Sequence, residues 1–132
     1  MYQYTYGLSG NLSSVTYPDN KVHTYHYNEQ IYTNNTDLPN ALTGITDETG
    51  VRYATYTYDA EGRAYITEHA GGVDRHTLTY NTDGSNTITT DPLGSNYTRQ
   101  FQTILGVIKA IGQSQLSTCD SPWSCHGDLI SL

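Results

Sequence analysis

The stretch Tyr56-Thr57-Tyr58-Asp59-Ala60-Glu61-Gly62-Arg63 combines the end of a β-strand with a tight turn. Residues two apart in a strand lie on the same face, so Tyr56 and Tyr58 point to one side. Asp59 and Gly62 are turn formers, because Asp bonds the backbone just ahead of it and Gly adopts positive φ. The stretch therefore predicts a strand that ends in a hairpin turn.

The same combination recurs along the 132 residues. The aligned pairs are Tyr4/Tyr6, Tyr25/Tyr27, Tyr56/Tyr58, Leu78/Tyr80 and Arg99/Phe101. Their second members are spaced by 21, 31, 22 and 21 residues, and the long interval holds an insertion near residues 29–40 that we expect to be a loop. Since a fixed period indicates a repeat architecture, these residues define about four repeats.

Turn signals keep the same phase as the aromatic residues. Gly10, Gly62 and Gly84 each follow the anchoring aromatic by four residues. A second turn falls near the middle of each repeat, at residues 18–20, 47–50, 70–72 and 91–94, and the last of these contains Asp91, Pro92 and Gly94. Two turns in about 21 residues leave strands of ordinary length, so each repeat is a β-hairpin.

These patterns predict an all-β protein: tandem antiparallel β-hairpin repeats that form a curved open sheet over residues 1–115, with residues 116–132 as an irregular, Cys-containing tail. Thirteen Tyr and a charged fraction of only 14% agree with a β-rich chain. Residues 101–112 show helical spacing, but Gly106 interrupts it, and we expect two short strands joined near Leu105 and Gly106. We expect the Tyr rings to stack between neighbouring strands as a buried ladder.

Charge narrows the classes of partner. Six basic and thirteen acidic side chains give a net charge of −7, which disfavours nucleic acid and anionic membranes. No apolar run is long enough to span a bilayer, and the N-terminal residues show no signal peptide. Because residues 1–10 already match the repeat, we expect a fragment or a truncated reading frame.

Tyr58-Asp59-Ala60-Glu61-Gly62-Arg63 matches the YDxxGR signature of RHS/YD-repeat proteins, and the resemblance extends over about residues 4–115. Residues 42–50 resemble the preceding hairpin of bacterial members, while residues 80–84 and 91–94 resemble weaker copies. The resemblance implies a strip of a large β-shell, of the kind that encloses a toxin in secreted bacterial proteins and that also occurs in insecticidal toxin complexes and teneurins. Full shells run to many hundreds of residues. Asp91-Pro92-Leu93-Gly94-Ser95 has Ser where the DPxGL core motif has Leu, so no autoproteolytic role is carried over.

Three groups of side chains could carry chemistry. His69 and His76 flank the turn at Gly71 and Gly72, and His23 and His26 flank Tyr25, but a hairpin supplies only two of the three or four ligands that a metal site needs. Asn81, Asp83, Asn86 and Asp91 lack the bidentate Glu of an EF-hand, so turn chemistry explains them better. Cys119 and Cys125, with His126, leave open a disulfide, free thiols or a zinc site. We predict no catalytic residue, no cofactor and no metal.

Two functions follow. The first is a non-catalytic structural module, part of a shell that is secreted or lies at the cell surface, whose partners are further repeats in cis, copies of itself through edge strands, or an enclosed toxin. The alternative is a module that binds a cell-surface carbohydrate or protein partner. The exposure of the Tyr6, Tyr27, Tyr58 and Tyr80 rings distinguishes the two functions. A structural ladder requires buried rings, whereas a row of exposed rings favours binding.

Overall fold

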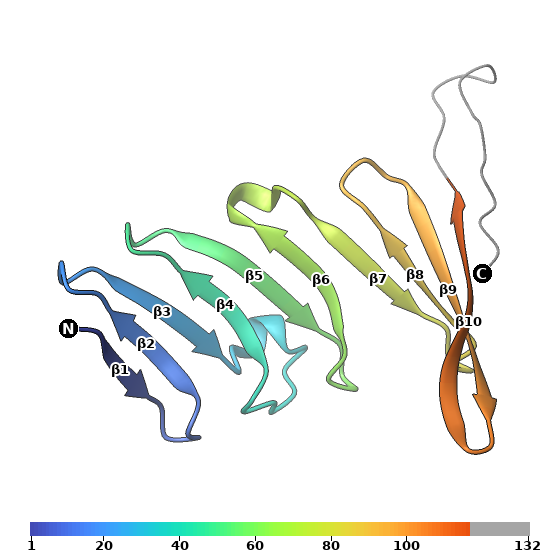
Figure 1. The fold of residues 1–132 in the computed structure, drawn as a ribbon, viewed down its shortest axis with the longest axis horizontal. Helices are drawn as coiled ribbons and strands as arrows, with labels where there is room; N and C mark the ends of the chain where they lie inside the picture. The colour runs from blue at the N-terminus through green and yellow to red at the C-terminus, as the bar shows by residue number, and fades with distance from the viewer. Residues whose placement is uncertain (117–132) are drawn as a thin grey trace. The chain divides into compact units, whose positions relative to one another are not determined.

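The computed structural model describes residues 1–116 and contains ten β-strands (Figure 1). The chain divides into two compact units, Met1–Arg75 and His76–Leu132, the second of which is described as far as Leu116. In both units every strand pairs with its neighbours in the sequence, and every pair is antiparallel. The fold class expected from the sequence is confirmed: all-β, an open antiparallel meander.

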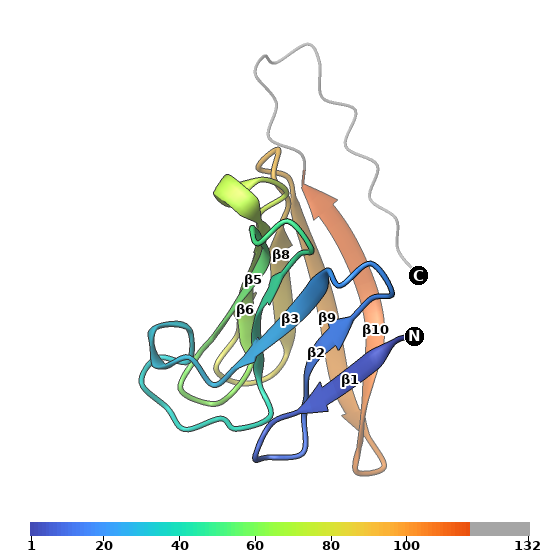
Figure 2. The same ribbon diagram turned by 90° about the vertical axis from the view of Figure 1, so that its left-hand side faces the viewer.

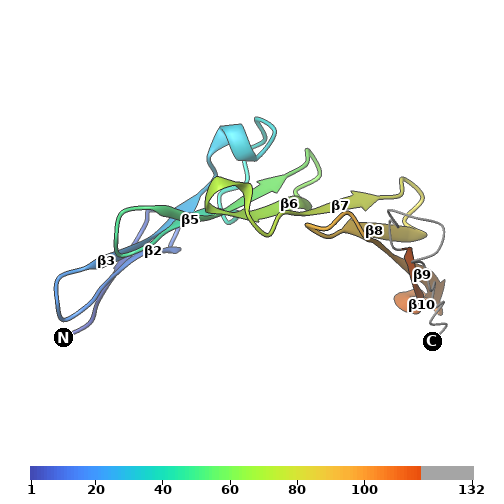
Figure 3. The same cartoon turned by 90° about the horizontal axis from the view of Figure 1, so that it is seen from above.

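The first unit contains six strands and two short 3-10 turns. They are β1 (Gln3–Tyr6), β2 (Leu12–Thr16), β3 (Val22–Tyr27), η1 (Gln30–Tyr32), β4 (Leu42–Thr46), β5 (Arg52–Tyr58), β6 (Ala64–His69) and η2 (Ala70–Gly72). The insertion expected near residues 29–40 is the connection between β3 and β4, and it contains η1. It rises from one side of this sheet as the light-blue segment in Figure 3.

The second unit contains β7 (His76–Tyr80), β8 (Asn86–Thr90), β9 (Asn96–Ile104) and β10 (Val107–Leu116). The last two strands lie side by side along their whole length (Figure 2). They turn at Leu105 and Gly106, which both have positive φ. The interpretation of residues 101–112 as two strands is confirmed, although the strands are longer than expected, with nine and ten residues.

One turn geometry closes five of the hairpins. The backbone N–H of the first residue donates to the carbonyl of the fifth, and the N–H of the fourth donates back to the first; the closing pairs are Gly7/Asn11, Tyr17/Lys21, Asp47/Val51, Asp59/Arg63 and Asp91/Ser95. The fourth residue has φ between +64° and +83°, and it is Gly in four turns and Asn20 in the other. This is the three-residue hairpin loop that ends in a left-handed residue. Turns of both predicted classes therefore share one structure in these five hairpins.

Very little of the chain is buried. Within residues 1–116 only Thr33, Thr43, Gly44 and Ala54 are buried, and all four belong to the first unit. A single sheet has side chains on two faces, and neither face can be buried unless another layer packs on it. The repeats therefore form a sheet without forming a core of their own.

The expectation of a directly stacked aromatic ladder is wrong, and the register explains why. The Tyr pairs of the first unit lie on β1, β3 and β5, which are alternate strands. The strands between them place other residues opposite the rings: Val15 and Leu12 face Tyr4 and Tyr6, Ile45 and Leu42 face Tyr25 and Tyr27, and Thr67 and Ala64 face Tyr56 and Tyr58. Successive Tyr pairs are thus two strands, about 9.5 Å, apart. Rings alternate with aliphatic and Thr side chains instead of stacking on each other.

Candidate functional site

In each unit, the aromatic face is the sheet face that carries the repeat-defining aromatics: Tyr4, Tyr6, Tyr25, Tyr27, Tyr56 and Tyr58 in the first unit, and Tyr80 and Phe101 in the second. Tyr6 is 63% exposed, whereas Tyr27, Tyr58 and Tyr80 are half-buried. The rings are therefore neither a closed core nor a fully exposed row. Burial raises the pKa of Tyr58, whose hydroxyl donates to the Leu42 carbonyl at 2.8 Å. At this position the ring is anchored to the neighbouring strand.

The turn residues expected from the sequence lie where the pattern placed them, and their carboxylates bond the backbone. Asp59 Oδ1 accepts from the N–H groups of Glu61 and Arg63 at 3.1 and 2.8 Å, while Asp59 Oδ2 accepts from Arg63 Nε at 2.8 Å. Burial raises the pKa of Asp59, but the hydrogen bonds from Arg63 outweigh it and leave that pKa lowered. Arg63 of the YDxxGR stretch therefore closes its own turn.

Asp91 uses the same arrangement. Its Oδ1 accepts from the N–H groups of Leu93 and Ser95, each at 2.9 Å. Pro92 follows Asp91 in the turn, and Gly94 is at the left-handed position. The chemistry that holds residues 91–95 is thus that of an ordinary repeat turn. No further role for this segment is required by its geometry.

A well-connected polar cluster lies on the opposite face of the first unit, and we call it the Arg52–Glu29 clasp. The Arg52 guanidinium donates to both carboxylate oxygens of Glu29, at 3.1 and 2.7 Å, to the Thr43 carbonyl at 2.8 Å, and to Thr55 Oγ1 at 3.0 Å. The Tyr32 ring lies 4.7 Å from Arg52 Cζ. The clasp therefore joins the start of the insertion to β4 and β5.

Gly44 is what allows this approach. A Cβ at Gly44 would collide with the Arg52 guanidinium, so only Gly leaves room for it. The buried hydroxyl of Thr43 donates to Glu29 Oε2 at 2.7 Å. Burial raises the pKa of Glu29, but the hydrogen bonds from Arg52 and Thr43 outweigh it, so this pKa is lowered and the ion pair is maintained at neutral pH. With both partners satisfied, the clasp is an anchor for the insertion.

A second polar cluster lies at one edge of the first unit. His23 Nδ1 is 3.0 Å from Glu48 Oε1, and a hydrogen bond to Glu48 raises the pKa of the Tyr17 hydroxyl. Tyr17 also makes an edge contact with the ring of Tyr2, at 5.6 Å between centroids. The neighbouring hollow, lined by Tyr17, Pro18, Asp19, Lys21, Glu48 and Thr49, lies between two turns. Because its charged groups are already paired with one another, the cluster is explained by turn packing.

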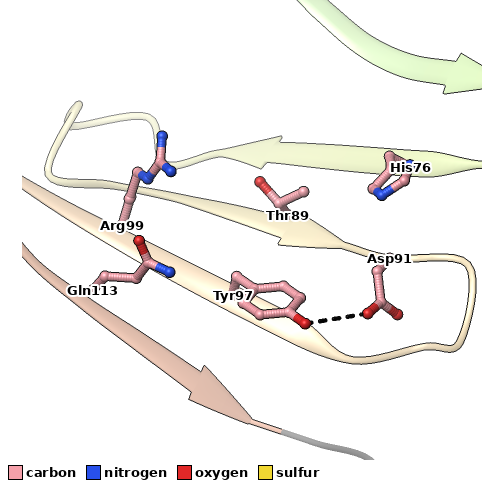
Figure 4. Close-up of a pocket in the computed structure, with 6 residues that line it drawn as sticks. All are labelled: His76, Thr89, Asp91, Tyr97, Arg99 and Gln113. Carbon is pink, nitrogen blue, oxygen red and sulfur yellow. Dashed lines mark hydrogen bonds between the residues drawn. The ribbon is translucent and has the colours of Figure 1, made fainter. Parts of the chain in front are cut away.

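The second unit contains a hollow of about 390 Å³ on its aromatic face. Its lining residues come from all four strands or their ends: His76, Thr89, Asp91, Tyr97, Arg99 and Gln113 (Figure 4). Register explains their convergence, because Thr89 is opposite Tyr97 and Arg99 is opposite Gln113. His76 and Asp91 were noted in the sequence for other reasons, whereas Thr89, Tyr97 and Gln113 were missed. The alternation Tyr97-x-Arg99-x-Phe101 was the available signal, since it places the first two beside the repeat aromatic.

Tyr97 and Arg99 differ in how they are held. The Tyr97 hydroxyl lies between Asp91 Oδ2, at 3.4 Å, and Gln115 Nε2, at 3.3 Å. Arg99 is exposed, and within residues 1–116 no carboxylate lies within ion-pair distance of its guanidinium. Figure 4 shows Arg99 and Asp91 at opposite ends of the hollow, with Tyr97 near Asp91. The hollow thus offers a cation, a ring and several polar groups.

The remaining candidates for metal binding take part in other contacts. His26 Nε2 is 2.7 Å from Thr46 Oγ1, and His69 stacks on Tyr53 with 4.8 Å between ring centroids. Asp83 accepts from the Ser85 N–H at 2.8 Å, and Asn81 and Asn86 both donate to the Ser85 hydroxyl. In the described residues no group of three His, Cys, Asp or Glu side chains is placed to hold a metal ion. Cys119, Cys125 and His126 lie outside the described residues.

No helix within residues 1–116 is long and apolar enough to cross a membrane. The sequence matches no protein-family model and no curated protein.

Proposed function

We propose that the chain is a non-catalytic structural module: a strip of RHS/YD-type β-hairpin repeats that forms part of the wall of a larger, exported shell enclosing a toxin. The observation that carries the proposal is the contrast between extensive strand pairing and scarce burial. Ten strands pair in order, yet only four residues of the described part are buried. An isolated sheet of this kind is marginal in water, and a second layer or further repeats complete it.

The repeated turn supports the same role. Five turns of one geometry, placed at both ends of the hairpins, reverse the chain in the same way along the sheet, as expected of a repeat architecture. The clasp adds an anchor for the insertion and satisfies its own charges. The turns and the clasp thus both stabilise the sheet and its connections.

The strand β10 provides an experimental test. It pairs only with β9 in the described structure, and Ile108, 71% exposed, lies on it. An edge strand with exposed aliphatic side chains invites addition of another strand along its outer edge. We expect the isolated chain to associate with itself through β10, in the place where a further repeat would pair.

Sedimentation velocity across a hundredfold range of concentration measures this association. We expect Ile108→Lys to shift the chain toward monomer, because a charge at an exposed edge opposes strand addition. Leu8→Lys is the matched control, since Leu8 is fully exposed at a turn and the change in charge is the same. A chain that remains monomeric at every concentration would contradict the proposal, as would equal effects of the two variants.

A second function, binding of a ligand on the aromatic face, is favoured by one observation. The hollow brings together the side chains of Tyr97, Arg99 and Gln113, which the turns and the strand pairing do not require. This candidate applies to the second unit.

A further inference from the structure

Two strands, β1 of the first unit and β10 of the second, are edge strands within residues 1–116. Successive residues of a strand direct their N–H and C=O groups to alternate sides. On β1, the Thr5 carbonyl accepts from a β2 hydroxyl at 3.0 Å, and the Gly7 N–H donates to the Asn11 carbonyl at 2.8 Å. Because Thr5 and Gly7 use the β2 side, Tyr4 and Tyr6 direct their backbone groups to the open side.

The open side of β10 is read in the same way. Val107 and Ile104 flank the two-residue turn and are opposite each other. Residues in that position use the inner side of a hairpin, so alternation directs the backbone groups of Ile108 and Ala110 away from β9. The register with β9 is regular over residues 107–110 and shifts beyond Ala110. This regular stretch has four residues, as β1 does.

The side chains at the two edges are complementary. Tyr4 and Tyr6 are 59% and 63% exposed, whereas the repeat-defining rings of β3 and β5, which have a strand on each side, are half-buried. On β10, Ala110 is opposite Phe101 and therefore lies on the aromatic face, together with Ile108, which is 71% exposed. Thus β1 presents rings that lack a second neighbour, and β10 presents aliphatic side chains that lack one.

The existing strand pairs indicate which edges match. In the first unit the repeat aromatics lie on β1, β3 and β5, and these strands pair with strands that carry no Tyr or Phe on that face. In the second unit β9 carries Phe101, and β10 contains no aromatic residue. A strand like β1 beside β10 continues this alternation. Pairing of β10 with β10, or of β1 with β1, would break it.

Neither edge carries a charge that would oppose this contact. Charged side chains and Pro are common means of protecting an edge strand. The strand β1 contains neither, and the single charge of β10, Lys109, is opposite Gln102 on the other face of the hairpin. The two edges therefore fit in backbone direction, length, side-chain chemistry and charge.

We propose that a second copy of this chain adds its β1 to the open side of β10, antiparallel, with Tyr4 opposite Ala110 and Tyr6 opposite Ile108. The inference rests on the structural role proposed above and names the partner that β10 takes in the isolated chain. Because the contact joins two different surfaces, each copy keeps one free edge and addition continues from copy to copy. The wall can thus be lengthened by separate polypeptides as well as by repeats in cis.

Two variants of the full chain, each blocked at one edge, test the pairing. Tyr4→Lys places a charge on β1, and Ile108→Lys places one on β10. In sedimentation velocity, we expect each variant alone to associate only at concentrations at least about tenfold higher than wild type. An equimolar mixture should form a one-to-one dimer at the wild-type concentration, since Ile108→Lys supplies an intact β1 and Tyr4→Lys an intact β10.

Leu8→Lys and Leu105→Lys are the matched controls, because both side chains are fully exposed at turns beside the same strands. They should associate like wild type, with circular dichroism confirming the sheet in every variant, and Tyr6→Lys should repeat the result of Tyr4→Lys. If the two β1 variants associate as wild type does, or if the mixture stays monomeric, the inference is overturned while association through β10 stands. A wild-type chain that is monomeric throughout would overturn both.

Discussion

Replacing Arg52 by Met should release the insertion from the sheet. The substitution removes two bonds to Glu29, one to the Thr43 carbonyl, one to Thr55 and the contact with Tyr32. Hydrogen bonds to charged groups contribute about 1.5–3 kcal/mol each when buried, but the side chains of Arg52 and Glu29 are 28% and 33% exposed. After allowance for solvent screening, we expect a loss of about 2 kcal/mol, confined to the insertion.

Hydrogen exchange measures this local loss directly. The amides of Asn35 and Thr36 bond to carbonyls within the insertion, at 3.0 and 2.9 Å. A loss of about 2 kcal/mol accelerates their exchange roughly 30-fold. Amides of β9 and β10 should be unaffected, since the clasp does not contact them.

Two further variants isolate the cause. Gly44→Ala leaves every charge in place but fills the space of the guanidinium, so it should accelerate the same amides. Arg75→Met is the matched control, because Arg75 is exposed and its pairing with Glu68 is long, at 3.8 Å; it should change exchange less than about threefold. If Arg52→Met also stays within about threefold of wild type, backbone bonds and the buried Thr33 hold the insertion, and the clasp is not its anchor.

Two other predictions concern the turns and pH. Gly50→Ala should lower the free energy of unfolding by about 1 kcal/mol in urea titration, because the φ of Gly50 is +82° and strains a residue with a Cβ, although no neighbouring atom would collide with that Cβ. Gly50→Asn should cost less than half as much, since Asn20 occupies the equivalent place in another turn. Equal costs for the two variants would refute the shared turn geometry. Acid should destabilise the sheet: the pKa values of Glu29 and Asp59 are lowered in the folded chain from ordinary values of 4.5 and 3.8, so their contribution is present above those values and is lost as pH falls through the lowered ones. The urea concentration at which half of the chain is unfolded, measured from pH 7 to pH 2, checks this. A urea midpoint that stays the same when the pH is lowered below 4 would contradict the prediction.

The hairpins were predictable because their causes are local. Asp59 and Gly62 specify a turn through hydrogen bonds between residues at most four apart. The same residue types at the same spacing therefore predict the same turn elsewhere in the chain. The two-strand interpretation of residues 101–112 succeeded for the same reason, since Gly106 falls where the chain reverses.

Features that depend on register were not predictable. The clasp joins residues 23 apart and lies beside an irregularity in the pairing of β4 with β5, which shifts between Ile45 and Thr46. Gly44 within an otherwise β-branched stretch was a usable sign of a close approach. The ladder was mispredicted because a repeat of two strands places equivalent residues on alternate strands, and the spacing of Tyr residues along the chain does not reveal what separates them.

The central claim is that these repeats are a strip of a larger wall, completed by chain beyond the described sheet. Immunoblotting of the native source with an antibody raised against residues 1–116 measures the size of the polypeptide that carries them. The account predicts a band many times larger than 132 residues, together with export from the cytoplasm. A band of 132 residues as the sole native species, monomeric on a native gel, would contradict it.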